Sequence, residues 1–160
     1  MTNPRHPTAV VRRATGPDIP ALSGLNAGLF SEDAGTRDTF VNVEWPGRAK
    51  YFADLIADGK RNVAFVADVD GSPAGYLVGR LQDASDFRPV VTAVLESMYV
   101  HADHRNRGVG AALVQTFLAW AKDADAGRAS VNAYCQNGGA IRFYERFGLR
   151  PKAITLDMAV

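Results

Sequence analysis

The residues best suited to chemistry gather in a short polar turn in the second half of the chain. Arg105 and Arg107 precede Gly108 and Gly110, and the glycines open an apolar run with helical spacing. The first amides of a helix lack intrahelical partners and carry partial positive charge, and glycine lets a ligand approach the backbone closely. The turn therefore predicts a cradle for a phosphate-bearing ligand. The alternative is that the two glycines only let a loop enter a helix.

Two common nucleotide-binding patterns do not fit this turn. A dinucleotide fingerprint needs G-x-G-x-x-G or a closing alanine, whereas Gly108 and Gly110 are followed by Leu113, late in the chain and after a hairpin signal. A P-loop needs a lysine and then serine or threonine after its second glycine, and that lysine is missing. Another kind of glycine turn must therefore hold the phosphate.

Two motifs in this half of the chain are informative together. The run R-N-R-G-V-G-A-A-L follows the strand-like L-E-S-M-Y-V, and N-G-G-A-I-R-F-Y-E-R-F-G-L lies farther along. The first resembles the acyl-CoA signature of the GNAT superfamily of N-acyltransferases, in which arginine or glutamine is followed by two residues, glycine, one residue, and glycine or alanine. Arg105, Gly108 and Gly110 match that signature, and the second run resembles the family's C-terminal motif. The resemblance covers roughly residues 95–149.

The resemblance implies that acetyl-CoA is the acyl-donating cosubstrate. It implies that backbone amides of the turn hold the pyrophosphate, namely those of Arg105, Asn106, Arg107, Gly108, Val109, Gly110 and Ala111. It also implies that the preceding strand binds the pantetheine arm through backbone groups of Met98, Tyr99 and Val100. Asn137 is expected to contact the arm from the opposite wall.

Direct acetyl transfer to an amine needs a neutral nucleophile, a stabilised oxyanion and a proton for the departing thiolate. Primary amines with a pKa of ~10.4 are mostly charged at neutral pH, so a base or a water chain must accept a proton. The resemblance implies that Tyr144 contacts the cofactor and protonates the thiolate, and Glu96 is the candidate base. The alternatives are that Tyr144 belongs to an aromatic helix core and that Glu96 is an ordinary exposed carboxylate. A backbone N–H near Met98 or Tyr99 is the candidate oxyanion donor.

Other reactive side chains give weaker signals. Cys135 has no histidine beside it in sequence, which favours direct attack over an acetyl-cysteine intermediate. His101 and His104 flank the turn without another evident ligand, so the sequence predicts no metal.

The acceptor amine is expected across the sheet from the thioester, lined by residues 30–45, Tyr76 and Arg80. Segment 30–45 carries acidic residues that suit a cationic amine but could equally be solvated loop charges: Glu32, Asp33, Asp38 and Glu44. Whether this segment is a lid or a plain connection stays open, and so does the choice between a small-molecule and a peptide amine.

Composition limits what the whole chain can be. Its 160 residues, 47% hydrophobic and 22% charged, suit one globular domain, and the net charge of +1 favours neither nucleic acid nor an anionic membrane as a partner. The single cysteine and the absence of an apolar run near the start favour the cytoplasm. Homodimers are common among proteins resembling this one, although no residue requires a homodimer.

The elements that must position the site follow from periodicity and turn signals. Strands are expected at residues 9–14, 63–69, 74–81, 90–100, 130–134 and 153–160, and helices at residues 18–29, 47–58, 109–124 and 137–148. Together with the resemblance they predict an α/β fold of the α+β type, with a largely antiparallel sheet of six to seven strands and about four helices. It should form a single domain over residues 9–160, after a flexible lead at residues 1–8.

These observations predict transfer of an acetyl group from acetyl-CoA to a primary amine by direct attack in a ternary complex. The rival prediction is a catalytically silent acyl-CoA-binding or regulatory module. Such a module would use the same turn without needing Tyr144 or an amine site.

Overall fold

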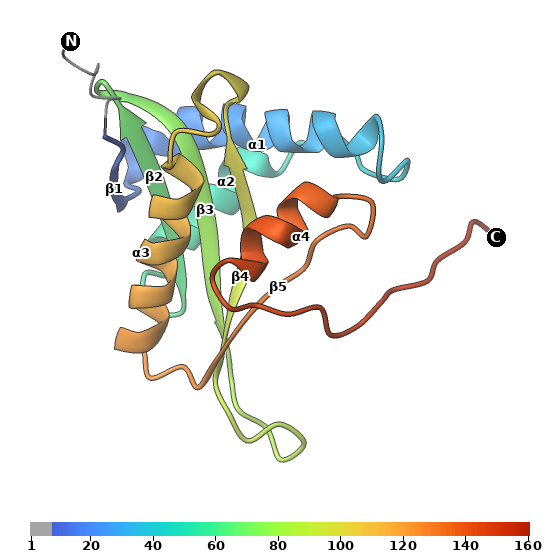
Figure 1. The fold of residues 1–160 in the computed structure, drawn as a ribbon. Coiled ribbons are helices and arrows are strands. Elements are labelled where there is room, and N and C mark those ends of the chain that lie inside the picture. Colours follow the sequence, from blue (N-terminus) through green and yellow to red (C-terminus); the bar gives the residue numbers. More distant parts are fainter. Residues whose placement is uncertain (1–7) are drawn as a thin grey trace, which may run out of the picture.

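A computed structural model describes residues 8–160, in which five strands form one sheet in chain order (Figure 1). The strands are β1 Val10–Arg13, β2 Asn62–Val69, β3 Ser72–Gln82, β4 Thr92–Val100 and β5 Arg128–Val131. The α-helices are α1 Ile19–Ala34, α2 Arg48–Ala57, α3 Val109–Asp123 and α4 Gly138–Glu145, and short 3-10 helices span Gly16–Asp18 and Ala102–His104. The expected lead falls outside the described residues except for Thr8.

The strands from β1 to β4 run antiparallel to their neighbours, and β5 lies parallel to β4. The predicted hairpin is confirmed, because Asp70 and Gly71 join β2 to β3 with φ angles of 51° and 79°. Two consecutive positive φ angles match the right-handed twist of the strands, and Asp-Gly adopts them readily.

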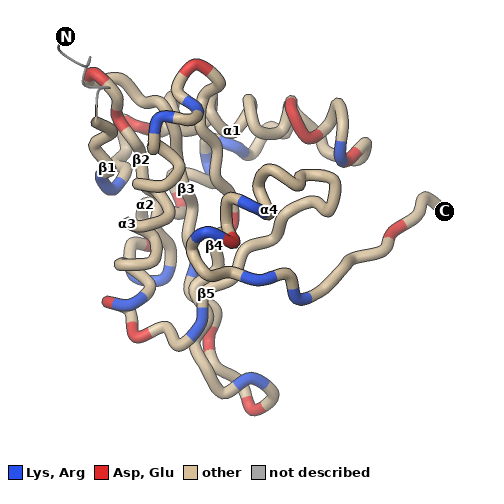
Figure 2. The backbone as a smooth tube through the Cα atoms, viewed as in Figure 1, with Lys and Arg blue, Asp and Glu red and all other residues tan. Residues whose placement is uncertain are grey.

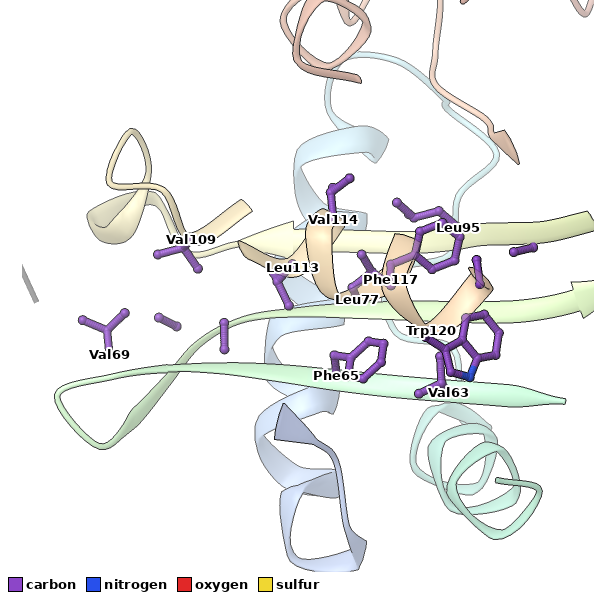
Figure 3. Packing of buried hydrophobic residues seen from close by; sticks show 14 residues of the cluster. Val63, Phe65, Val69, Leu77, Leu95, Val109, Leu113, Val114, Phe117 and Trp120 are labelled. Carbon is purple, nitrogen blue, oxygen red and sulfur yellow. The ribbon is translucent and has the colours of Figure 1, made fainter. Parts of the chain in front are cut away.

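Helices cover both faces of the sheet. Alternating residues of β2 point to opposite sides, so that Phe65 packs under α3 while Val66 packs under α1 and α2. Figure 3 shows the α3 side, where Leu113 and Phe117 of the helix meet Phe65 and Leu77 of the strands. These two apolar layers hold β4 rigidly beside the start of α3.

An ionic cluster fastens the first strand to the sheet. The Arg12 guanidinium lies 2.8 Å from an Asp18 carboxylate oxygen and 2.7 Å from one of Asp68. The hydrogen bonds from Arg12 are the main cause that lowers the pKa of Asp18 to about 2. Elsewhere, acidic and basic residues are interspersed along the chain (Figure 2). No helix within residues 8–160 is both long and apolar enough to cross a membrane.

The structure corrects the expected strand count from six or seven to five. Residues 153–160, predicted as a closing strand, are extended but unpaired, and all of them are exposed. Alternating apolar residues favour a strand, yet a strand also needs a neighbouring backbone, which periodicity does not supply. The first helix extends beyond the expected residue 29 to Ala34, so it includes the beginning of segment 30–45.

Candidate active site

One edge of β4 is open where β5 diverges from it. β5 pairs with β4 over four residues, and the last pair joins Leu95 to Val131. Beyond Leu95, within the described part of the chain, β4 is paired with β3 alone. The open edge of residues 98–100 therefore lacks a partner strand and can bind an extended ligand, although the Val100 carbonyl already accepts a hydrogen bond from Arg105 Nε.

Glu96 is the extra residue of a β-bulge in β4. The register between β3 and β4 shifts after Val78, which leaves Glu96 without a partner on β3. Its carboxylate accepts a hydrogen bond from the Tyr51 hydroxyl of α2 at 3.3 Å, and Arg80 Nη2 lies 3.7 Å away. Burial, followed by the charge of Glu96, raises the pKa of Tyr51, so this phenol stays a neutral donor. The carboxylate is thus oriented on the α2 side while remaining within reach of solvent.

The glycine turn has the geometry of an anion cradle. Asn106 and Gly108 adopt positive φ angles of 59° and 80°, and α3 begins directly afterwards. The Ala112 amide donates to the Gly108 carbonyl at 3.0 Å. The amides of residues 109–111 precede this bond and so lack an i−4 partner inside the helix. They lie at the positive end of the helix dipole, just past the open end of β4.

Gly110 also permits a close approach between helices. A Cβ atom at this position would lie 3.3 Å from Cζ of Phe143 on α4 and 3.8 Å from Cγ2 of Val100. A side chain here would require the Phe143 ring to shift by a few tenths of an ångström. Sequence reasoning assigned Gly110 to the cradle alone, because nothing local shows that Phe143 packs against it.

The Arg105 side chain fastens the turn to α1. Its Nη2 lies 2.6 Å from Glu32 Oε1, its Nε donates to the Val100 carbonyl at 2.9 Å, and its guanidinium lies 5.2 Å from the centre of the Tyr99 ring. The Tyr99 hydroxyl donates to the same Glu32 oxygen at 3.3 Å. With the Arg105 side chain held by Glu32, contact with a phosphate would fall to backbone amides and to the exposed Arg107.

Helix α4 brings the second sequence motif to the same opening. Asn137 is confirmed as the N-cap residue, because its Oδ1 accepts a hydrogen bond from the Ala140 amide at 3.2 Å. Tyr144 is half-buried, its ring packs edge-on against Phe143 at 5.2 Å, and loss of solvent raises its pKa to about 12. The phenol is therefore protonated at neutral pH and can donate a proton.

An aromatic and polar wall lies on the α1–α2 side. The rings of Phe30 and Trp45 stack with centres 6.2 Å apart, and the Arg48 guanidinium lies over both. Arg48 Nε donates to Asn26 Oδ1 at 3.0 Å, and Asn26 Nδ2 donates to the Tyr76 hydroxyl at 2.8 Å. Tyr76 is fully buried, so the expectation that it lines the acceptor site is wrong, and it supports this wall from beneath.

The acidic residues of segment 30–45 have separate roles. Asp33 pairs with Arg37 at 2.7 Å, whereas Glu44 is exposed. Asp38 accepts a hydrogen bond from the Tyr134 hydroxyl at 3.0 Å, and burial together with this carboxylate raises the pKa of Tyr134 to about 12. Since Asp38 follows α1 and Tyr134 follows β5, this bond joins two walls of the opening.

The remaining reactive residues are Cys135, His101 and His104. Cys135 is exposed and unpaired. The rings of His101 and His104 are 6.2 Å apart, and His101 Nδ1 accepts a hydrogen bond from the Asp103 amide at 3.3 Å. Across residues 8–160, no group of three or more His, Cys, Asp or Glu side chains gathers in a way that could hold a metal ion.

The chain belongs to the acetyltransferase (GNAT) family, whose family model matches residues 32–149. Members of this family use acetyl-CoA, so the open edge, the glycine turn and α4 belong to an acetyltransferase fold. An uncharacterized N-acetyltransferase of Methanocaldococcus jannaschii is 33% identical over 92 residues, which are 56% of this chain and 40% of that protein. The chain thus matches well under half the length of this curated relative.

Solved structures share the fold at low sequence identity. A tetramutant of the BH1408 protein from Bacillus halodurans superposes with a TM-score of 0.83 at 18% identity, over 94% of this chain and 99% of that one. The aminoglycoside N-acetyltransferase AAC(6')-Iy, in complex with CoA, superposes with a TM-score of 0.78 at 14% identity, over 99% of this chain and 98% of that one. At these identities the likeness concerns the fold.

Proposed function

We propose that this protein transfers the acetyl group of acetyl-CoA to a primary amine of a small molecule or peptide, by direct attack in a ternary complex. The observation that carries the proposal is the open edge of β4 beside the glycine turn. Glu96 lies at the bulge of that strand, and Tyr144 lies on the neighbouring α4. A cofactor arm along residues 98–100 would run between these two side chains.

The cofactor would be held mainly by backbone groups. In the proposed complex the amides of residues 105–111 bind the pyrophosphate, because they lie at a helix N-terminus where glycine permits close contact. Residues 98–100 bind the pantetheine amides as a neighbouring strand would, and Asn137 contacts the arm from the α4 side. Binding through backbone amides does not require the Arg105 side chain, which already binds Glu32.

Glu96 is the proposed base for the amine. It accepts the ammonium proton directly or through water, and the neutral nitrogen then attacks the thioester carbonyl carbon. The C–N bond forms as the carbonyl oxygen gains negative charge, which a backbone N–H near Met98 or Tyr99 would stabilise. Collapse of this intermediate breaks the C–S bond as Tyr144 gives its proton to the thiolate. The surplus proton on the attacking nitrogen then returns to the Tyr144 phenolate, directly or through water.

The acceptor is proposed to enter from the α1–α2 side, past the wall formed by Phe30, Trp45 and Arg48. Glu96 faces this side through its hydrogen bond to Tyr51. The exposed, unpaired Cys135 suits the cytoplasm as the compartment of this activity.

Thiol release from acetyl-CoA, measured over a panel of primary amines, tests the proposal. With an accepted amine, Tyr144→Phe and Glu96→Gln should each lower kcat by about 100-fold or more. Tyr134→Phe is the matched control, because it removes a phenol outside the proposed proton path. Unchanged kcat in both variants would refute the assigned roles, and calorimetric binding of acetyl-CoA without turnover of any amine would indicate the silent module instead.

A further inference from the structure

Glu96 and Arg80 bring two opposite charges together on the α2 side of the sheet. Arg80 Nη2 lies 3.7 Å from Glu96 Oε1, which is close enough for an ion pair but too far for a hydrogen bond. The Arg80 side chain is 53% exposed and that of Glu96 is 35% exposed, so a ligand can reach both. Because the two charges cancel, the pair suits a ligand that carries one ammonium group and one carboxylate.

The Arg80 guanidinium still has donors available for such a carboxylate. The Arg48 guanidinium already donates to Asn26 Oδ1 at 3.0 Å. That of Arg105 already donates to Glu32 Oε1 at 2.6 Å. Within residues 8–160, by contrast, Arg80 makes only the longer contact with Glu96. Since a guanidinium can bind a carboxylate through two parallel hydrogen bonds, a ligand carboxylate would complete the contacts of Arg80.

The register of the sheet sets the order of the groups in this site. Arg80 pairs with Val94 of β4, Glu96 lies at the bulge beyond it, and residues 98–100 follow. A cofactor arm along residues 98–100 would therefore have Glu96 beside it and Arg80 on the far side of Glu96. In an α-amino acid a single carbon atom joins the amine to the carboxylate. An ammonium group at Glu96 would thus leave the carboxylate within reach of Arg80.

A row of aromatic rings leads away from these two charges. The Tyr51 hydroxyl donates to Glu96 at 3.3 Å, and the Tyr51 ring lies edge-on to that of Trp45 with centres 5.8 Å apart. Trp45 in turn stacks with Phe30. All three residues are half-buried, so their rings offer apolar surface beside the acceptor site. A large apolar side chain of the acceptor would cover this surface.

The charges around the aromatic row disfavour a second ammonium group. The Arg48 guanidinium lies 5.7 Å from the centre of the Phe30 ring and 5.4 Å from that of Trp45, so the row carries a positive charge. The carboxylates of segment 30–45 are already bound to neighbouring side chains, apart from that of the exposed Glu44: Glu32, Asp33 and Asp38. A polyamine would therefore find few free carboxylates, and a peptide N-terminus would bring no carboxylate to Arg80.

We propose that the acceptor is a free α-amino acid with a large apolar side chain, an inference that rests on the acetyl transfer proposed above. Its ammonium group binds Glu96, its carboxylate binds Arg80, and its side chain lies against Tyr51 and Trp45. Transfer replaces an N–H bond of the amine with an N–C bond and releases CoA and one proton. The N-acetylamino acid no longer carries the ammonium charge that Glu96 attracts, which favours its release.

A matched pair of acceptors tests the role of Arg80. Phenylalaninol has the amine and the ring of phenylalanine but a hydroxymethyl group in place of the carboxylate. The wild-type enzyme should favour phenylalanine by ~10–100-fold in kcat/KM, the factor expected for a hydrogen bond between charged groups. Arg80→Gln should bring this ratio close to one. Arg88→Gln, which removes an exposed arginine of the β3–β4 loop, should keep the wild-type ratio.

The ratio compares two acceptors on one protein, so a general loss of activity does not change it. Equal losses for both acceptors in Arg80→Gln would show that Arg80 only orients Glu96, and would overturn the proposal. The aromatic row is tested in the same way with phenylalanine and alanine. Trp45→Ala should lower the preference for phenylalanine by ~3–10-fold, and an unchanged preference would refute the contact with this row.

Titration calorimetry in the presence of CoA separates this inference from the proposed activity. CoA carries no acetyl group, so phenylalanine can bind the complex without turnover. Binding that is lost in Arg80→Gln would support the amino-acid site even if no amine were acetylated, an outcome that refutes the activity alone. Turnover of spermidine or of a peptide amine, with no preference for phenylalanine over phenylalaninol, would support the activity and overturn the amino-acid site.

Discussion

The part of the chain before residue 122 and the part after it are built differently. Every buried residue lies in the first part, where α1, α2 and α3 cover both faces of β1 to β4. The second part contains β5, α4 and the segment 151–160, and its apolar side chains are only half-buried or exposed. The first part has a complete core, whereas the apolar side chains of the second part remain partly accessible to solvent.

This difference fits the proposed activity. The open edge of β4 and the glycine turn lie where the two parts meet, and a cofactor bound there would contact both. A well-packed first part holds Glu96 and the turn in place before the cofactor arrives, so less ordering is needed on binding. The second part would gain part of its cover from the bound cofactor.

Two phenylalanine-to-alanine substitutions, one in each part, test the contrast in packing. They have the largest expected effect on the free energy of unfolding. Phe117 is buried on α3, and Phe143 is half-buried on α4. Phe117→Ala should lower the free energy of unfolding by about 3–5 kcal/mol because it leaves a closed cavity. Phe143→Ala should lower it by about 1–2 kcal/mol. Urea unfolding of the chain without cofactor measures both, and equal losses would contradict the distinction between the two parts.

The ionic cluster at β1 should add a smaller, pH-dependent stabilisation to the first part. Hydrogen bonds from Arg12 lower the pKa of Asp18 from its ordinary 3.8 to about 2. The stabilisation is therefore complete above about pH 4 and is lost as the pH falls through about 2. Asp18→Asn should cost about 1–2 kcal/mol at pH 7, after allowance for the partly exposed Arg12. Urea unfolding of the wild type and of Asp18→Asn at pH 7, 4, 3 and 2 checks this prediction. The difference between their free energies of unfolding should shrink as the pH falls, and a difference that does not change with pH would contradict this assignment.

The Glu32–Arg105 pair should have the smallest effect, because it is partly exposed. Glu32→Gln loosens the link between α1 and the turn, at a cost of about 0.5–1 kcal/mol. The apparent KM for acetyl-CoA should rise ~2–5-fold with little change in kcat. Asp83→Asn is the control, since it removes an exposed pair with Arg61 at 2.7 Å elsewhere on the sheet. An equal KM in wild type and Glu32→Gln would show that the pair does not position the turn.

The features that the sequence predicted are those encoded within a few neighbouring residues. The Asp70-Gly71 hairpin, the start of α3 after the glycines and the Asn137 cap each depend on local backbone preferences. The bulge at Glu96, the approach of Phe143 to Gly110 and the binding of Arg105 by Glu32 depend on residues far apart in the sequence. A single sequence carries no local signal for such contacts.

The predicted strand at 153–160 illustrates the same limit. Alternation correctly marks these residues as suited to a sheet, but it does not say which backbone they pair with. The residues assigned to cofactor binding and catalysis likewise stay predictions until a ligand is observed.

The most direct test of the central claim is amide hydrogen exchange with and without CoA. We expect slower exchange at residues 98–100 and 105–111, where the strand edge and the turn would donate to the cofactor. Slower exchange should extend to residues 131–145 of the second part, while the core strands β2 and β3 should change little. If saturating CoA protects a different set of amides, or leaves the exchange of these amides unchanged, the proposed site is contradicted.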